Sequence, residues 1–453
     1  MIGIGMLSLI LFILIVTIVS VYFKRTCAEG MFIAWISVLA LSGNRFLEVA
    51  PASIKAGFTA GVVFPTMAFC FMSTLMQQTG IITRLVQIFN SLFGRIRGGA
   101  GYVSTAASAL MGMVSGSGPG NAAVSGTITI PWMVQSGFSK ELATTIVAGN
   151  ATLGASIPPS TVMFMLLAMP IVAGTIETSE LYMTCLCGGL YLVVLRMITV
   201  FYFTRKYNIQ KVDASYIHPL SESLSKGWRS LLIFISILLP LILTTGPLSA
   251  KLKDINTIGT KGIKSIDMMV WIPVLLILVT IIEGWNRLPH SFQGWYDLIR
   301  NDVSTYSNVG GTLIFALCGG AVMTRLGMAQ EAQALFTALG NNVSQVIVLA
   351  VVGGVIMLAA GPMSTTATLA ALGSVAYAAL ISTGMKPSVA LTCIIIFGAV
   401  EGSMPPSSSP LFIAAGIARL DNPIVCFKNL VKFYVSGSAI VAMLIGMGIL
   451  PVL

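Results

Sequence analysis

The sequence predicts an all-α polytopic membrane protein built from two inverted-topology repeats. Of its 453 residues, 56% are apolar and only 9% are charged, whereas a soluble protein of this size needs far more charge to cover its surface. Several apolar stretches also approach the roughly 20 residues that a helix needs to cross a membrane. In addition, the two halves of the chain resemble each other in an ungapped register.

The apolar stretches and their flanking segments predict the elements of each half. For the first half, residues 1–230, we expect helices at 4–23, 31–49, 57–79 and 180–202, an interfacial arm at 80–97, a hairpin at 99–134, a broken helix at 139–175 and a cytoplasmic loop at 203–230. For the second half, residues 231–453, we expect helices at 231–246, 267–283, 304–326 and 433–451, an arm at 327–343, a hairpin at 345–382 and a broken helix at 387–420. We interpret the first stretch as a retained helix rather than a signal peptide, because Lys24 and Arg25 follow it and no positive segment precedes it.

The two halves match when the chain is shifted against itself by 247 residues. Gly80 then falls on Gly327, and the match ends with a shared Ser-x-Pro-Pro-Ser motif that begins at Ser156 and at Ser403. An ungapped register over this length, closed by the same motif, indicates an internal duplication.

The distribution of charge predicts that the two copies have opposite orientations. Residues 80–97 combine a helical apolar stripe with three arginines, one of them Arg84, whereas residues 327–343 contain no Lys or Arg and have Glu331 at the matched position. Because positive residues accumulate on the cytoplasmic side, the first arm should lie inside and the second outside. The same bias explains the net charge of +10 better than nucleic-acid binding does.

Two segments in each half should not cross the membrane as continuous helices. Residues 115–121, Ser-Gly-Ser-Gly-Pro-Gly-Asn, cannot sustain a helix, and the arm before them is only about 16 residues long, roughly 24 Å. A hairpin that enters and leaves by one face fits better, and residues 361–368 give the second half the same design. The helices after the hairpins are interrupted by paired prolines, which free backbone carbonyls before the break and leave unpaired N–H groups after it.

Two hairpin tips and two broken helices predict one binding site near the middle of the membrane. Their carbonyl, hydroxyl and amide oxygens suit a hard monovalent cation, and the restarted half-helices suit an anionic group of a substrate. For any single Ser or Gly, close packing of helices is the alternative. Because Ser117 and Ser364 occupy matched tips, and Ser156 and Ser403 matched breaks, we expect sodium to bind at these four positions.

Two polar residues lie within apolar helices near the breaks. Glu401 is an intramembrane acid, which marks either a functional group or a cap of the restarted helix. Asn150 should point into the site or pair with a neighbouring helix. The chain has no HExxH motif and no serine and histidine together at membrane depth, which argues against an enzyme. A channel would not need two matched sets of hairpin tip and broken helix, so a channel is disfavoured as well.

Four segments resemble the large membrane subunit of tripartite ATP-independent periplasmic (TRAP) transporters, the DctM-like family. They are LMQQTGIITRLVQIFNSLFGRIRGG, MVSGSGPGNAAVSGTITIPWM, GASIPPS and MPPSSSPLFIAAGIA, and the resemblance covers roughly 57–175 and 304–420. It implies an elevator-type importer of carboxylate-type organic anions, coupled to sodium and needing no other cofactor, in the bacterial inner membrane. It also implies two partners, a periplasmic solute-binding protein and a separate small four-helix membrane subunit. A self-sufficient ion-coupled carrier of the same inverted-repeat superfamily is the alternative.

The resemblance also assigns residues to the two half-sites by matching position. The first half-site comprises Ser115, Gly116, Ser117, Asn121, Ser156, Pro158, Pro159 and Ser160. The second comprises Ser364, Thr365, Thr366, Ser403, Pro405, Pro406 and Ser407.

Overall fold

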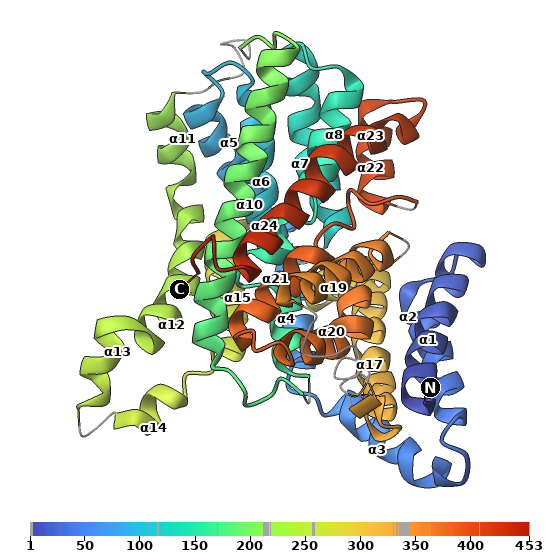
Figure 1. The fold of residues 1–453 in the computed structure, drawn as a ribbon. Coiled ribbons are helices and arrows are strands. Elements are labelled where there is room, and N and C mark those ends of the chain that lie inside the picture. The colour runs from blue at the N-terminus through green and yellow to red at the C-terminus, as the bar shows by residue number, and fades with distance from the viewer. Residues whose placement is uncertain are drawn as a thin grey trace.

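The described chain consists of helices joined by turns, with no strand among the residues that the structure describes (Figure 1). The computed structural model describes residues 3–115, 117–169, 171–211, 217, 219–255, 259–328, 330–331, 334, 344–361, 363–406 and 408–452. Five helical segments in this part of the chain are long and apolar enough to cross a membrane: Thr178–Lys206, Leu220–Thr244, Met268–Arg287, Val303–Arg325 and Pro423–Gly446. These spans agree with a multi-pass membrane protein.

The helices follow one another in two series. Those of the first half are α1 Ile4–Thr17, α2 Cys27–Ala40, α3 Phe46–Phe58, α4 Val63–Thr79, α5 Ile81–Phe93, α6 Gly99–Ser115, α7 Gly118–Gln135, α8 Lys140–Asn150, α9 Thr161–Leu167 and α10 Thr178–Lys206. Those of the second half are α11 Leu220–Gly227, α12 Ile233–Thr244, α13 Gly246–Lys253, α14 Gly259–Lys264, α15 Met268–Gly284, α16 Phe292–Asn301, α17 Val303–Arg325, α19 Gln345–Ala359, α20 Thr365–Ile381, α21 Pro387–Gly398, α22 Ser409–Ala418, α23 Phe427–Asn429 and α24 Ser436–Gly446. Short π-helices at Ile18–Tyr22 and Leu430–Val435 extend α1 and precede α24.

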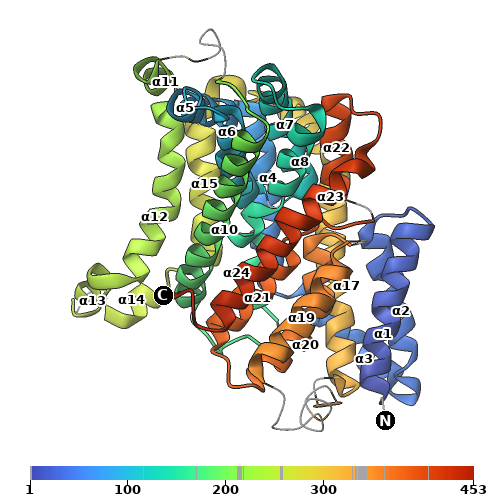
Figure 2. The same ribbon diagram turned by 45° about the horizontal axis from the view of Figure 1, so that its top comes forward.

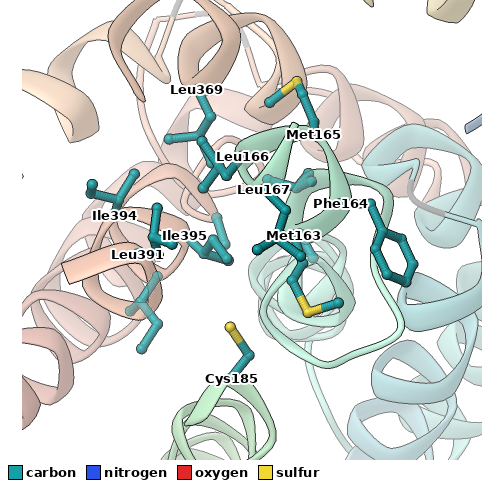
Figure 3. Close-up of a cluster of buried hydrophobic side chains, with 14 of the residues drawn as sticks. Met163, Phe164, Met165, Leu166, Leu167, Cys185, Leu369, Leu391, Ile394 and Ile395 are labelled. Atoms are coloured by element: carbon teal, nitrogen blue, oxygen red, sulfur yellow. The ribbon is translucent and has the colours of Figure 1, made fainter. Parts of the chain in front are cut away.

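The outer helices flank a centre made of hairpins and broken helices. Both views place α1, α2 and α3 beside α17 on one flank and α12, α13 and α14 on the opposite flank (Figures 1 and 2). Between them, α6 packs against α7, and α19 packs against α20. A buried apolar cluster joins the two halves, where Met163–Leu167 of α9 lie near Leu369, Leu391, Ile394 and Ile395 (Figure 3).

Serine side chains begin the helices around this centre. A serine at an N-cap accepts a hydrogen bond from a backbone N–H that the first turn leaves unpaired. Such caps start α7, α8, α9, α20 and α22, with N···O distances of 3.1–3.2 Å, and they are provided by Ser117, Ser139, Ser160, Ser364 and Ser408. The returning arm of each hairpin and each restarted segment therefore carries its own start signal in the sequence.

The predicted helix 31–49 needs correction, because the structure divides it. Helices α2 and α3 meet at an angle of 114°. The chain turns at Ser42-Gly43-Asn44, where Gly43 has a φ of +54°, a conformation that glycine adopts at little cost. Because α3 continues to Phe58, the next helix begins at Val63 rather than at residue 57.

The predicted loop 203–230 is also too long. Helix α11 begins at Leu220 and continues through a 3₁₀ turn into α12. Its polar sequence resembles a loop, but it packs against α5, where the Ser223 and Ser91 hydroxyls lie 2.6 Å apart. The predicted arm 327–343 lies largely outside the described residues. Glu331 within it accepts hydrogen bonds from the N–H groups of Gly5 and Met6, at 3.1 and 2.9 Å, and so caps α1.

An ion pair fixes the interfacial arm α5 to the helices beside it. Arg84 Nη2 lies 2.6 Å from Glu283 Oε1, and Arg84 Nε donates to Ser230 Oγ at 2.9 Å. The side chains of Arg84 and Glu283 are only 16% and 6% exposed. Arg84 and Arg287 also donate to the carbonyl of Thr79, at 3.2 and 2.9 Å, just where α4 ends. The arm is therefore held at its first turn.

The two broken helices touch each other at their breaks. Thr152 Oγ1 donates to the carbonyl of Ala399 at 2.7 Å, and these residues are 247 positions apart, the same shift that aligns the two halves. Gly402 lies so close to α8 that a Cβ atom there would be 2.4 Å from the carbonyl oxygen of Ala148. Both proline pairs, Pro158-Pro159 and Pro405-Pro406, contain a cis peptide bond. The breaks therefore meet at the centre of the molecule.

Replacing Glu283 by Ala should destabilise the protein strongly, because it leaves the Arg84 guanidinium buried without its partner. We expect a loss of about 3 kcal/mol in the free energy of unfolding, measured by denaturant unfolding of the detergent-purified protein. Lys226→Ala is the control, because it breaks an ion pair of similar length, 2.7 Å to Glu222, in which Lys226 is 71% exposed. That change should cost less than about 1 kcal/mol. Equal effects of the two substitutions would contradict a structural role for the buried pair.

Replacing Gly402 by Ala should separate the two breaks, because the new methyl group needs the space that the Ala148 carbonyl occupies. We expect a loss of about 1–3 kcal/mol, typical of overpacking, together with a loss of uptake. The control is Gly416→Ala in α22, where a Cβ atom would meet no heavy atom within 4 Å. Alanine there should leave stability unchanged or raise it, because glycine disfavours a helix interior. Wild-type stability and uptake of Gly402→Ala would disprove the close crossing.

Candidate functional site

A central cavity of about 350 Å³ lies where the two halves meet. Both hairpin tips line it, with Ser117 from the first and Ser364 from the second. Both breaks line it as well, through Thr152 and Glu401, and Arg25 reaches it from the connection between the first two helices. A second cavity of about 360 Å³ borders the same tips and extends toward α4 and the beginning of α17.

The first half-site contains buried amide groups with unused acceptor atoms. Asn121 Nδ2 donates to the carbonyls of Ser108 and Ala151, at 2.9 and 2.7 Å, and so ties α7 to α6 and to the break. Asn150 Nδ2 donates to Thr105 Oγ1 at 2.9 Å. Within the described residues, the side-chain oxygens of both asparagines are buried without a hydrogen-bond donor. Buried polar atoms are nearly always paired with protein or ordered water, so these oxygens are available to a bound water or ion.

The hydroxyl of Ser156 is a third such atom. It lies in the break itself, is 2% exposed, and has no hydrogen-bond partner in the part of the chain that the structure describes. Three oxygens without a described partner thus belong to the first hairpin and the first broken helix. All three come from uncharged side chains.

The second half-site differs because it contains a carboxylate. Glu401 Oε2 accepts from the backbone N–H of Thr365 at 2.8 Å and from Thr365 Oγ1 at 3.0 Å. Thr365 is the first residue of α20, so Glu401 caps the returning arm of the hairpin. The alternative that Glu401 caps the restarted helix α22 is wrong, because Ser408 Oγ takes that place and accepts from Leu411 N at 3.1 Å.

The structure brings many of the predicted site residues together. Those that line the central cavity are Ser117, Ser364, Thr365, Thr366 and Glu401. Those that are buried around it without lining it are Asn121, Asn150, Ser156, Pro158, Pro159, Ser160 and Ser403. Pro405 is half-buried and Pro406 is exposed. Gly116, Ser407 and the side chain of Ser115 lie outside the described residues.

Sequence reasoning missed several residues of the cavity wall. The sequence marked Arg25 only as a positive charge that follows the first helix, and nothing local placed it beside the hairpin tips. Cys27 also lines the cavity, and its thiol contacts Ser364. Thr152 could have been found from the register, because its matched residue is Ala399 and the two breaks were expected to meet.

Comparisons with known proteins identify the family. A family model described as "Tripartite ATP-independent periplasmic transporter, DctM component" matches residues 6–453. The C4-dicarboxylate TRAP transporter large permease protein DctM of Vibrio cholerae is 29% identical over 168 residues, 37% of this chain and 36% of that protein. The protein of the same name from Pseudomonas aeruginosa is 30% identical over 172 residues, 38% of this chain and 39% of that protein. The chain thus spans less than two fifths of the length of each of these relatives.

A solved transporter has the same fold. The crystal structure of the Alcanivorax borkumensis YdaH transporter matches with a TM-score of 0.65 at 17% identity, and covers 96% of this chain and 98% of that chain. Both DctM relatives are named as permeases rather than as enzymes. The chain therefore belongs to the DctM component family of tripartite ATP-independent periplasmic transporters, as a multi-pass large permease of the bacterial inner membrane.

Proposed function

We propose that this chain forms the translocation pathway of an importer that carries a small carboxylate-type organic anion together with sodium. One observation carries the proposal: both hairpin tips and both breaks border a single cavity. Broken backbone inside a membrane is tolerated where it is buried in protein or lines an aqueous site, and transporter sites are commonly built this way. The names of the DctM relatives, which refer to C4-dicarboxylates, support the substrate class.

Sodium is the coupling ion that the first half-site favours. The unsatisfied oxygens of Asn121, Asn150 and Ser156 are neutral acceptors, and a hard cation prefers oxygen ligands. Leaving each of them unpaired costs about 1–3 kcal/mol, a cost that a bound cation removes. The serine hydroxyls at the tips, Ser117 and Ser364, are already used as helix caps, but a hydroxyl oxygen has a second lone pair for a cation.

Movement of the centre against the flanks would provide alternating access. In this elevator-type proposal, the hairpins and broken helices carry the site, and the flanking helices α1–α4, α12, α15 and α17 remain fixed. The Arg84–Glu283 pair holds the first turn of α5 to the fixed part, so the arm can act as a tether. The contact between the matched residues Thr152 and Ala399 supports the two inverted repeats on which this scheme depends.

We also propose that the permease works with two partners, a small helical membrane subunit and a periplasmic solute-binding protein. The part of the chain that the structure describes offers five spans of crossing length, while much of the rest forms the hairpins and breaks that must move. Because few spanning helices remain for the fixed part of the permease, an added membrane subunit is favoured. A self-sufficient carrier of the same superfamily is the alternative.

Removing the hydroxyl of Ser156 should raise the sodium concentration needed for half-maximal uptake. We expect an increase of about 5- to 150-fold for Ser156→Ala, because one buried ligand is lost. Ser403→Ala at the matched break should act in parallel, and so should Ser117→Ala and Ser364→Ala at the tips. The control is Ser382→Ala, whose hydroxyl donates to the carbonyl of Ala379 in its own helix at 2.7 Å. If all four variants titrate like the parent in proteoliposomes, these serines serve packing and the sodium assignment is wrong.

Purification in mild detergent at native expression should recover the permease in a stable complex with the small helical subunit. The reason is that few membrane-spanning helices of the permease belong to its fixed part. Mass spectrometry of the purified complex measures the composition, and uptake after reconstitution measures activity. Recovery of the permease alone, with full uptake, would contradict the partner proposal and favour the self-sufficient carrier.

A further inference from the structure

The charges around the hairpin tips do not suit a plain dianion. Arg25 and Glu401 are the charged side chains among the described residues of the central cavity, and Asp302 borders the second cavity. The described walls therefore present one positive and two negative groups. A carboxylate of a solute beside Glu401 would be repelled, and burial strengthens that repulsion.

Glu401 is held in place, but no cationic side chain of the described residues neutralises it. Both of its hydrogen bonds, from Thr365 N and Thr365 Oγ1, reach Oε2. A carboxylate can accept about four hydrogen bonds, so acceptor capacity remains. Among the described residues, no Lys, Arg or His side chain lies within salt-bridge distance of it, although it is only 7% exposed. A positive partner stabilises a carboxylate buried this deeply, and the cavity that Glu401 lines is where one can bind.

The duplication shows that Glu401 is not needed to build the break. Its matched residue is Gly154, whose Cβ atom, if present, would lie 2.0 Å from the backbone of Gly112. In the first half, the hairpin and the break therefore touch directly, backbone against backbone. In the second half, a carboxylate connects them instead. At this matched position, only the second half therefore contributes an acidic side chain to the cavity.

Arg25 supplies the opposite charge from another wall of the same cavity. Its Nε lies 3.8 Å from Glu29 Oε2 in a loose, exposed pair, and its terminal nitrogens make no hydrogen bond within the described residues. A guanidinium with free terminal nitrogens matches the two oxygens of a carboxylate. The cavity volume of about 350 Å³ is in the range of sites for small solutes.

We infer that the solute bound in this cavity is a zwitterion, with a carboxylate directed to Arg25 and an ammonium group directed to Glu401. The inference rests on the proposed function, because it takes the cavity as the transport site. Within solutes that carry a carboxylate, it changes the expected substrate from a plain organic anion to an amino-carboxylate, which has no net charge. The negative charge of Glu401 attracts the ammonium group of an amino-carboxylate and repels the second carboxylate of a dicarboxylate. The site should therefore discriminate against dicarboxylates of similar length.

The test compares two solutes of similar length, 4-aminobutanoate and succinate, which differ in the group at one end. Isothermal titration calorimetry on the purified complex in sodium buffer should show at least about tenfold tighter binding of 4-aminobutanoate. Glu401→Gln keeps acceptor and donor atoms near Thr365 but removes the charge, and it should bring the two affinities within about threefold. Arg25→Gln should weaken both solutes and preserve their ratio, since both carry a carboxylate.

Glu177→Gln is the control, because Glu177 is an exposed acid away from the cavity and should leave both affinities unchanged. Thermal unfolding of each variant verifies that it is folded. Succinate binding as tight as that of 4-aminobutanoate, an absence of 4-aminobutanoate binding, or an unchanged ratio in Glu401→Gln would each overturn the inference. The sodium titration of Ser156→Ala tests the proposed function separately. Its result can support sodium-coupled transport even when the binding data overturn the inference of a zwitterionic solute.

Discussion

The crossing of the two broken helices is the contact on which the rest of the molecule depends. Thr152 donates to the Ala399 carbonyl, and Gly402 lies against the Ala148 carbonyl. The close approach at Gly402 requires glycine, because a Cβ atom there would collide with the Ala148 carbonyl. Since each hairpin packs on its own broken helix, the position of this crossing also sets the positions of both tips. The cavity follows from that arrangement.

Much of the centre could be predicted from sequence because its signals are local. The paired prolines of a Ser-x-Pro-Pro-Ser motif cannot lie in a helix interior, and a Ser cap such as Ser117 starts a new helix. The repeat then allowed the weaker second copy to be interpreted by comparison with the first. The family assignment, carried by the same motifs, is confirmed by the match over residues 6–453.

The errors occur where position depends on distant contacts. The division at Gly43 lies in a short polar segment, residues 42–45, within a mainly apolar stretch, and the average composition of that stretch predicted a continuous helix. Residues 220–230 have the composition of a loop, but α11 is stabilised by packing on α5. Arg25 and Glu401 reach one cavity from segments far apart in sequence, and no local pattern could reveal that they share it.

The contact between Thr152 and Ala399 has an evolutionary consequence, because it joins two positions that the proposed duplication makes equivalent. If the two halves descend from one unit that paired with a second copy of itself, a single mutation there altered both sides of the crossing simultaneously, so only self-compatible residues could be accepted. Once the copies diverged, each side could change alone. A lone acid such as Glu401, opposite in character to Gly154, is a residue that only a diverged pair can tolerate. Under the proposed duplication, the asymmetry of the present site therefore arose after the two halves had diverged.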